Sequence, residues 1–236
     1  DMRGMFQSAT AFNQPINTTS NVTMNGSTYT AWDVSNVTNM NGLFVNATAF
    51  NQDIGGWNVS GVTDMNSLFS SATDFNKDIG DWNVSGVTAM FDMFEGAAAF
   101  NQDIGGWNVS ACIDMSYMFG DALVFNKEIR GWAVTNVTNF TDMFYGATKF
   151  QEQYSAPDTP TADFFKILIL ITNSNISNAV TAWINNPLTA ADLYGPIDEW
   201  DVSNVTNMSN LFRNKDTFNS DISGWNTSNV TNMSYM

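Results

Sequence analysis

The sequence predicts an α/β repeat solenoid, with short parallel strands on one face and short helices or 3₁₀ turns on the other. The first observation behind this prediction is a spacing of 25 residues that recurs along the chain, in the tryptophans Trp32, Trp57, Trp82, Trp107 and Trp132 and in the phenylalanines Phe50, Phe75, Phe100, Phe125 and Phe150. The second is a pair of apolar periodicities inside one unit. A unit this short cannot bury its apolar face alone, so neighbouring copies must stack.

One unit runs from Ile54 to Asp78. Trp57 and Val59 alternate with polar residues between glycine-containing turns, which predicts a short half-buried strand. The apolar residues that follow are spaced i, i+3, i+4 and i+7, which predicts a short helix: Met65, Leu68, Phe69 and Ala72. This layout is leucine-rich-repeat-like, with Trp and Val in strand positions that Leu usually holds. A β-helix with strands on every face is the alternative, and the helical spacing argues against it.

The register of the repeat predicts four segments. Residues 1–154 form a first array of 25-residue units, with a polar loop insertion at 17–31. Residues 155–160 read as a linker and 161–199 as the cap of a second array, which starts at 200–236 where Trp200 and Trp225 resume the spacing. Within the cap we expect a strand over 166–171 and helices over 177–185 and 190–194. Both chain ends fall inside a repeat, so we expect a fragment of a longer protein.

Composition narrows the classes of function. The chain has 23 acidic and 8 basic residues, a formal charge of −15, which disfavours nucleic acid and anionic membrane surfaces. It contains no histidine, the commonest general base and transition-metal ligand, and no apolar run long enough to span a bilayer. No nucleophile motif or glycine-rich phosphate loop is present. We therefore expect no enzyme, no cofactor, no metal site and no direct membrane insertion in this fragment.

A polar ladder on the predicted strand face is the candidate binding site. Its members repeat beside the buried tryptophan and valine: Asn58, Ser60, Asn83, Ser85, Asn108 and Ser110. In a parallel sheet such side chains align at about 4.8 Å. Two readings stay open, a hydrogen-bonded ladder that stabilises the stack and a flat polar platform that binds glycans or protein loops.

Other repeated residues carry a structural and a functional reading. An acidic row precedes the repeated isoleucine, at Asp53, Asp78, Asp103, Glu128 and Asp221. It binds either Ca²⁺ or the amides of the adjacent turns, and the spacing fits no known calcium loop. Cys112 replaces a core valine and, like the repeated methionines and tryptophans, is expected in the core. The insertion is either a tolerated surface loop or a binding loop.

Many Asn-x-Ser/Thr sequons arise from the repeat itself, so their number does not indicate glycosylation. If the host glycosylates the chain, the loop asparagines Asn17, Asn21 and Asn25 are the candidates.

Two segments carry a family resemblance, namely 100–110, which reads FNQDIGGWNVS, and 205–212, which reads VTNMSNLF. They closely resemble the BspA-like repeat family, which includes mycoplasma-type surface lipoproteins with a 25-residue repeat and many algal and bacterial cell-surface proteins. The resemblance covers 1–154 and 175–236. It implies a leucine-rich-repeat-like solenoid, an extracellular or cell-surface location and, for some members, adhesion.

Together these observations predict a surface module for adhesion or for protein or glycan recognition. The alternative is a structural scaffold, a subunit of an extracellular assembly that contacts neighbouring copies and has no ligand of its own. The uniform Asn and Ser residues of the ladder favour the scaffold, whereas the resemblance favours adhesion.

Overall fold

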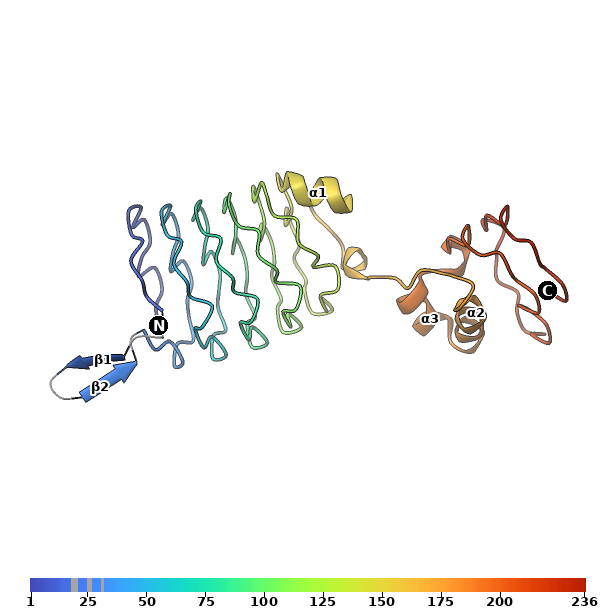
Figure 1. The fold of residues 1–236 in the computed structure, drawn as a ribbon, viewed down its shortest axis with the longest axis horizontal. Helices are drawn as coiled ribbons and strands as arrows, with labels where there is room; N and C mark the ends of the chain where they lie inside the picture. The colour runs from blue at the N-terminus through green and yellow to red at the C-terminus, as the bar shows by residue number, and fades with distance from the viewer. Residues whose placement is uncertain (18–20, 25–26, 31) are drawn as a thin grey trace. The chain divides into compact units, whose positions relative to one another are not determined.

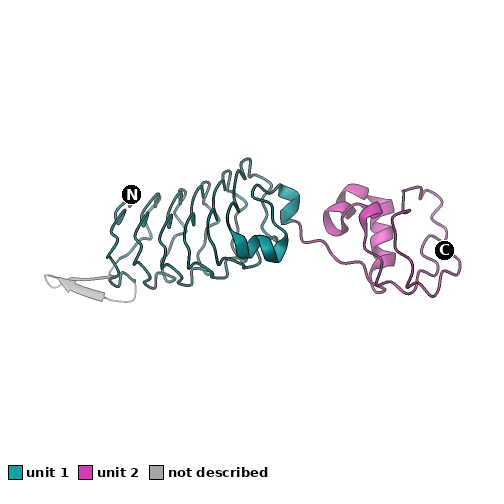
Figure 2. Cartoon of the chain, turned by 90° about the horizontal axis from the view of Figure 1, so that it is seen from above, with its two compact units in different colours: residues 1–165 teal, residues 166–236 magenta. Residues whose placement is uncertain are grey.

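The computed structural model describes residues 1–17, 21–24, 27–30 and 32–236. The chain divides into two compact units, Asp1–Phe165 and Lys166–Met236 (Figure 2). Each unit is described by itself below.

Regular secondary structure is sparse in the described residues. Strands β1 (Asn21–Met24) and β2 (Ser27–Thr30) pair antiparallel within the insertion. The helices are α1 (Thr148–Tyr154), α2 (Ile176–Asn185) and α3 (Pro187–Tyr194), with 3₁₀ turns at Ala162–Phe165 and Ile197–Glu199. The repeats themselves are coils built from turns and irregular backbone (Figure 1).

The predicted fold class is wrong, because the described repeats contain neither the expected parallel strands nor the expected helices. Parallel pairing is reduced to one residue per coil, through the bridges Asn39–Asp64, Asp64–Ala89, Ala89–Asp114 and Asp114–Asn139. The segment from Trp57 to Val59 forms no strand, since reverse turns on both sides of it use the amides of Trp57 and Val62 within the same coil. The chain is therefore not an α/β solenoid.

The segment from Met65 to Ala72 is a series of tight turns instead of a helix. Ser67 and Ser71 lie in the left-handed region, with φ of 53° and 56°. Three amides that a helix would use internally donate to the next coil: those of Ser67, Phe69 and Ser71 bond to the carbonyls of Phe91, Met93 and Glu95. The apolar spacing was read correctly as one buried face, but successive turns that alternate with left-handed residues produce the same face.

Coils are named here by the buried phenylalanine of this turn segment, so that unit 1 contains the Phe44, Phe69, Phe94, Phe119 and Phe144 coils. Along the segment, every second amide donates to the following coil, 24 residues later in the chain. The same pattern joins each pair of neighbouring coils, from Phe44→Leu68 to Phe119→Met143. The coils therefore stack in register through bonds that all point the same way.

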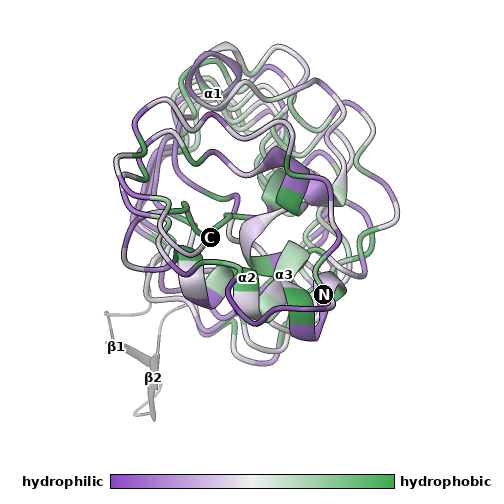
Figure 3. Ribbon diagram, turned by 90° about the vertical axis from the view of Figure 1, so that its right-hand side faces the viewer, coloured by the Kyte–Doolittle hydropathy of each residue, from purple (hydrophilic) through white to green (hydrophobic). Residues whose placement is uncertain are grey.

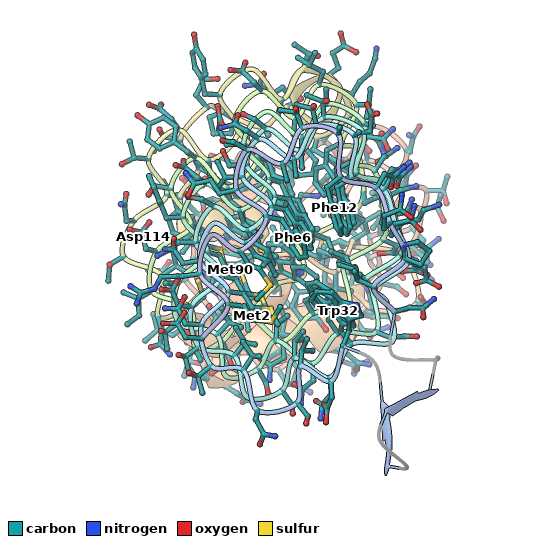
Figure 4. The ribbon with its side chains drawn as sticks, turned by 90° about the vertical axis from the view of Figure 1, so that its left-hand side faces the viewer. Met2, Phe6, Phe12, Trp32, Met90 and Asp114 are labelled. Atoms are coloured by element: carbon teal, nitrogen blue, oxygen red, sulfur yellow. The ribbon has the colours of Figure 1, made fainter. Side chains whose placement is uncertain are left out.

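Rows of stacked aromatic rings fill the centre of unit 1. Phe69 lies 5.6 Å from Phe44 and 5.7 Å from Phe94 by ring centroids, and 3.9 Å from Phe75 of its own unit. Seen along the stack, Phe6 and Phe12 lie inside the coil, whereas Asp114 lies at its outer edge (Figure 4). The prediction that the repeated rings form the core is confirmed for the tryptophans from Trp57 to Trp132, whereas Trp32, next to the insertion, is 37% exposed.

Each core tryptophan also forms a hydrogen bond to the preceding 25-residue repeat. The indole Nε1 of Trp107 donates to the Ile79 carbonyl at 3.1 Å, and Trp57, Trp82 and Trp132 repeat the bond with Ile16, Ile54 and Ile104. These bonds are buried. Donor and acceptor are 28 residues apart in the sequence, except in the Trp57 bond, where the insertion makes the separation 41 residues.

We expect Trp107→Phe to lower the free energy of unfolding of unit 1 by about 1–2 kcal/mol, because it removes a buried hydrogen bond and part of the ring volume. The Ile79 carbonyl still accepts a hydrogen bond from the Trp82 amide in the variant. The loss of stability is therefore smaller than it would be if the substitution left a buried carbonyl without any donor. Urea denaturation of both proteins measures the difference. An unchanged midpoint and slope would show that the indole bond contributes nothing.

The last coil of unit 1 is covered by the residues that follow it. The amide of Phe144 donates to the Asp158 carbonyl, and the amide of Asp142 donates to Thr159 Oγ1. Phe164 and Phe165 pack their rings on Phe144. The segment 155–160, expected to be a linker, thus supplies acceptors that the next coil would otherwise provide, and unit 1 extends to Phe165.

Unit 2 begins with two helices that pack on its first coil. Asn186 accepts from the Thr189 amide and Pro187 occupies the first turn, so α3 starts there rather than at Ala190. Ala179 and Val180 of α2 are buried in one cluster with Trp200 and Val202. Both helices carry polar and apolar stretches (Figure 3).

The strand expected over 166–171 is absent. A backbone bond from the Ile169 amide to the Leu193 carbonyl and an ion pair between Lys166 and Asp192 join the segment to the end of α3. Among the described residues no strand lies beside the segment with which it could pair.

Candidate functional site: the variable face

The coils of unit 1 differ most from one another on the side formed by the turn segment. We call this side the variable face and define it by four positions of each coil. In the five named coils these positions hold, in chain order, Asn41, Gly42, Val45, Asn46; Asn66, Ser67, Ser70, Ser71; Phe91, Asp92, Glu95, Gly96; Ser116, Tyr117, Gly120, Asp121; and Thr141, Asp142, Tyr145, Gly146. The stack repeats its core and varies this face, so the face can carry specificity.

The backbone explains why these positions tolerate such different residues. The second and fourth positions take a left-handed conformation, whether they hold a glycine such as Gly42 (φ 63°) or a residue such as Tyr117 (φ 54°). For a non-glycine residue this conformation costs on the order of 1 kcal/mol. The side chains there contribute little to the core, which is filled from the positions between them.

A groove crosses the first coils of this face. It has a volume of about 480 Å³ and is open to solvent along its length. Gly4, Gly42 and Ser67 contribute small or absent side chains, and Arg3 and Asp92 stand at different coils along it. The groove exists because successive coils place short residues at the same left-handed position.

Exposed aromatic rings and carboxylates follow where the groove ends. Phe91 and Tyr117, each 37% exposed, meet edge to face with their centroids 6.3 Å apart. Tyr145 is 54% exposed, and it occupies the position that Gly120 holds in the coil before it. Glu95 accepts a hydrogen bond from Ser70 Oγ at 2.9 Å. This part of the face is both acidic and aromatic.

Two pKa shifts on this face arise from burial, hydrogen bonding and neighbouring negative charge. Partial burial, with the nearby Glu95 and Asp114 carboxylates, raises the pKa of Asp92 to about 6. Tyr117 hydrogen-bonds the Asp142 carboxylate, which raises the pKa of its hydroxyl. Within the described residues neither Asp92 nor Glu95 forms an ion pair.

We expect Asp92→Asn to stabilise unit 1 near pH 7.5, by on the order of 1 kcal/mol once solvent screening of this partly buried group is allowed for. The folded carboxyl has the higher pKa, so the folded state takes up protons more readily. The charged Asp92 carboxylate therefore destabilises the folded wild type most above pH 6, and this loss of stability disappears as the pH falls towards 4. Thermal melts of both proteins between pH 4 and 8 should converge at the acidic end. A constant offset would contradict the assigned cause.

The predicted polar ladder lies elsewhere on the coils and bonds within each coil. Asn58 Oδ1 accepts from Ser60 N at 3.2 Å and from Ser60 Oγ at 2.7 Å. The same two bonds recur in the next two units, at Asn83 with Ser85 and at Asn108 with Ser110. These asparagines are exposed, and the bonds shape a local turn in each coil.

An asparagine ladder between coils exists at a position that the sequence analysis did not select. The Oδ1 atom of one asparagine accepts from the backbone amide of the next, through Asn13, Asn51, Asn76, Asn101 and Asn126. These residues directly follow the repeated phenylalanine. Their regular 25-residue recurrence next to a buried ring was the signal that could have identified them.

The remaining predicted sites are local or structural. In the acidic row, Asp53 and Asp103 accept hydrogen bonds from the backbone amides of Gly55 and Gly105 at 3.0 Å. Of the two alternatives for these carboxylates, calcium or the amides of adjacent turns, these bonds favour the turn amides. Cys112 is buried, and burial raises the pKa of its thiol to about 11. Among the described residues, no group of three or more metal-binding side chains is placed to hold an ion.

The candidate glycosylation residues lie in the insertion. Asn17 is its first residue and is half-buried, Asn21 begins β1, and Asn25 is outside the described residues. None of the helices in the described ranges combines the length and the apolar character that crossing a bilayer requires.

The geometry defines a stacked-repeat protein with a constant core and a variable face. The chain belongs to the family described as "Mycoplasma protein of unknown function, DUF285", whose model matches residues 1–26, 19–122, 77–183 and 185–236. No curated protein and no solved structure matches the chain.

Proposed function

We propose that the chain is a recognition module that binds a protein or glycan through its variable face. One observation carries the proposal: neighbouring coils keep the same core residues but change the residues of this face, from small and neutral in the Phe69 coil to aromatic and acidic in the Phe94 coil. A stack that served only as a spacer would need no such change. The rings of Phe91 and Tyr117 are exposed, which is typical of contact surfaces.

The proposal includes an extracellular or cell-surface location and a role in adhesion. The resemblance of residues 100–110 and 205–212 to BspA-like surface proteins supports both. Binding rather than catalysis is the proposed activity, because the variable face presents exposed aromatic rings beside hydroxyls and carboxylates, groups typical of contact surfaces.

A binding array with a matched surface variant tests this function. The whole chain is screened against immobilised glycans and extracellular matrix proteins, beside the double variant Phe91→Ser/Tyr117→Ser. We expect ligands that the wild type retains and the variant loses, while both proteins melt cooperatively. A control, Asn58→Ala/Asn83→Ala, alters the predicted polar ladder and should keep binding.

Two results would overturn the proposal. Retention by the variable-face variant together with loss by the ladder control would move the site to the ladder. The absence of any ligand, with ordered self-association in sedimentation velocity, would favour the structural scaffold.

A further inference from the structure

We propose that the groove of the variable face binds an extended, basic segment of a partner protein, and that a lysine or arginine of this segment lies beside Asp92, Phe91 and Tyr117. This inference rests on the proposed function and names the partner's chemistry. It follows from the shape of the groove, from the charge at one part of it and from an arrangement that the chain already uses elsewhere.

The shape favours an extended chain. The groove is open and crosses successive coils, from Gly4 through Gly42 and Ser67 to Asp92. Its volume of about 480 Å³ lies within the range of ligand sites, but it is open to solvent and does not enclose a small molecule. A segment lying across the coils could place one side chain at each left-handed position, where the receptor's own side chains are short.

The charge favours a cation. Asp92 lies near Glu95 and Asp114, and partial burial together with these like charges raises its pKa. A bound ammonium or guanidinium group would relieve that repulsion, whereas the hydroxyl of a neutral sugar would not. The chain as a whole carries a charge of −15, which would also steer a basic partner towards it.

The aromatic rings complete a site suited to a cation. Phe91 and Tyr117 are exposed next to Asp92, and the faces of aromatic rings attract ammonium and guanidinium groups. The chain holds one of its own arginines in this way. Arg130 lies 2.7 Å from the Glu128 carboxylate and 4.7 Å from the centre of the Tyr154 ring. The proposed site offers the same pair of groups, a carboxylate and a tyrosine. The cation that lines the groove, Arg3, belongs to an earlier coil and is paired with Asp1.

The control uses a second acidic groove on another part of the coils. It is lined by Asp53, Gly55, Gly56, Asp78 and Asp81 and includes no aromatic residue. Removing a charge there changes the net charge of the protein as much as removing it at Asp92. Asp81→Asn is therefore the matched control for Asp92→Asn.

The test measures binding of a fluorescein-labelled peptide of alternating lysine and serine to the whole chain by anisotropy at 50 mM salt. We expect Asp92→Asn and Tyr117→Ala each to weaken binding by about fivefold to tenfold, and Asp81→Asn by less than about twofold. A peptide with glutamine in place of lysine should not bind. Thermal melts show that each variant is folded.

Three outcomes would overturn the inference. Equal weakening by Asp92→Asn and Asp81→Asn would reveal attraction to the net charge alone. Equal binding of the glutamine peptide would exclude cation recognition. Binding of neutral oligosaccharides, but not of the lysine peptide, at a surface that Tyr117→Ala disrupts would refute the basic partner and leave the proposed recognition function intact.

Discussion

Replacing Phe94 by alanine is expected to remove about 3–5 kcal/mol from the free energy of unfolding of unit 1. Phe94 is fully buried, and its ring stacks on Phe69, Phe100 and Phe119 at centroid distances of 5.7, 4.0 and 5.6 Å. The alanine would leave a cavity in the middle of the aromatic row, and the hydrogen bonds on both sides of the coil oppose its collapse. Denaturant unfolding followed by circular dichroism measures the loss.

Phe91 provides the control for this prediction. It lies three residues earlier in the same coil and is 37% exposed on the variable face. We expect Phe91→Ala to cost clearly less than Phe94→Ala, about 1–2 kcal/mol, because Phe91 is partly exposed and its ring meets the surface residue Tyr117 instead of the aromatic row. Equal losses from the two variants would mean that the rings of the row are not the core.

The second large effect is expected from Gly105→Ala. A methyl group at Gly105 would lie 2.5 Å from the Glu128 carbonyl oxygen of the following unit, closer than such atoms approach. The backbone of one coil would have to move away from the next. We expect a loss of about 2–3 kcal/mol. A methyl group at Gly80 would lie 2.6 Å from the Asp103 carbonyl oxygen, so Gly80→Ala should cause a similar loss of stability.

The neighbouring Gly106 serves as the matched control. A methyl group there meets no atom within 4 Å. Gly106→Ala should therefore be neutral or stabilising by up to about 1 kcal/mol, because it restricts only the unfolded chain. If both alanines were equally tolerated, the coils could not be packed as closely as the structure places them.

The sequence was sufficient to predict the repeat, its 25-residue register and its aromatic core. Trp57, Phe69 and Phe75 recur at fixed intervals, and a residue that recurs in this way needs the same buried surroundings in every copy. The two helices of unit 2 were also predicted, since Ala179, Val180 and Pro187 carry ordinary helix signals.

The local backbone could not be predicted from the same pattern. The spacing of Met65, Leu68, Phe69 and Ala72 fits a helix and a series of turns equally well. The difference lies in Ser67 and Ser71, whose left-handed conformation is stabilised by hydrogen bonds to the next coil. Such bonds form only when the next coil is stacked on the segment, so the local conformational preferences of the residues do not predict them.

The candidate site was missed for a related reason. The sequence analysis looked for residues that repeat, and it selected Asn58 and its equivalents. The variable face is recognisable by positions that do not repeat, such as Ser67, Asp92 and Tyr117. Their common orientation becomes visible only when the turn segment is known to face outward at these positions.

The central claim is that the turn segment of each coil is bonded to the next coil rather than to itself. Scalar couplings across hydrogen bonds, measured by NMR on the isotopically labelled chain, test it most directly. The account predicts a coupling between the amide nitrogen of Phe94 and the carbonyl carbon of Met118, whose oxygen lies 2.9 Å away. A coupling from Phe94 to the carbonyl of Met90, four residues earlier, would indicate a helix and contradict the account.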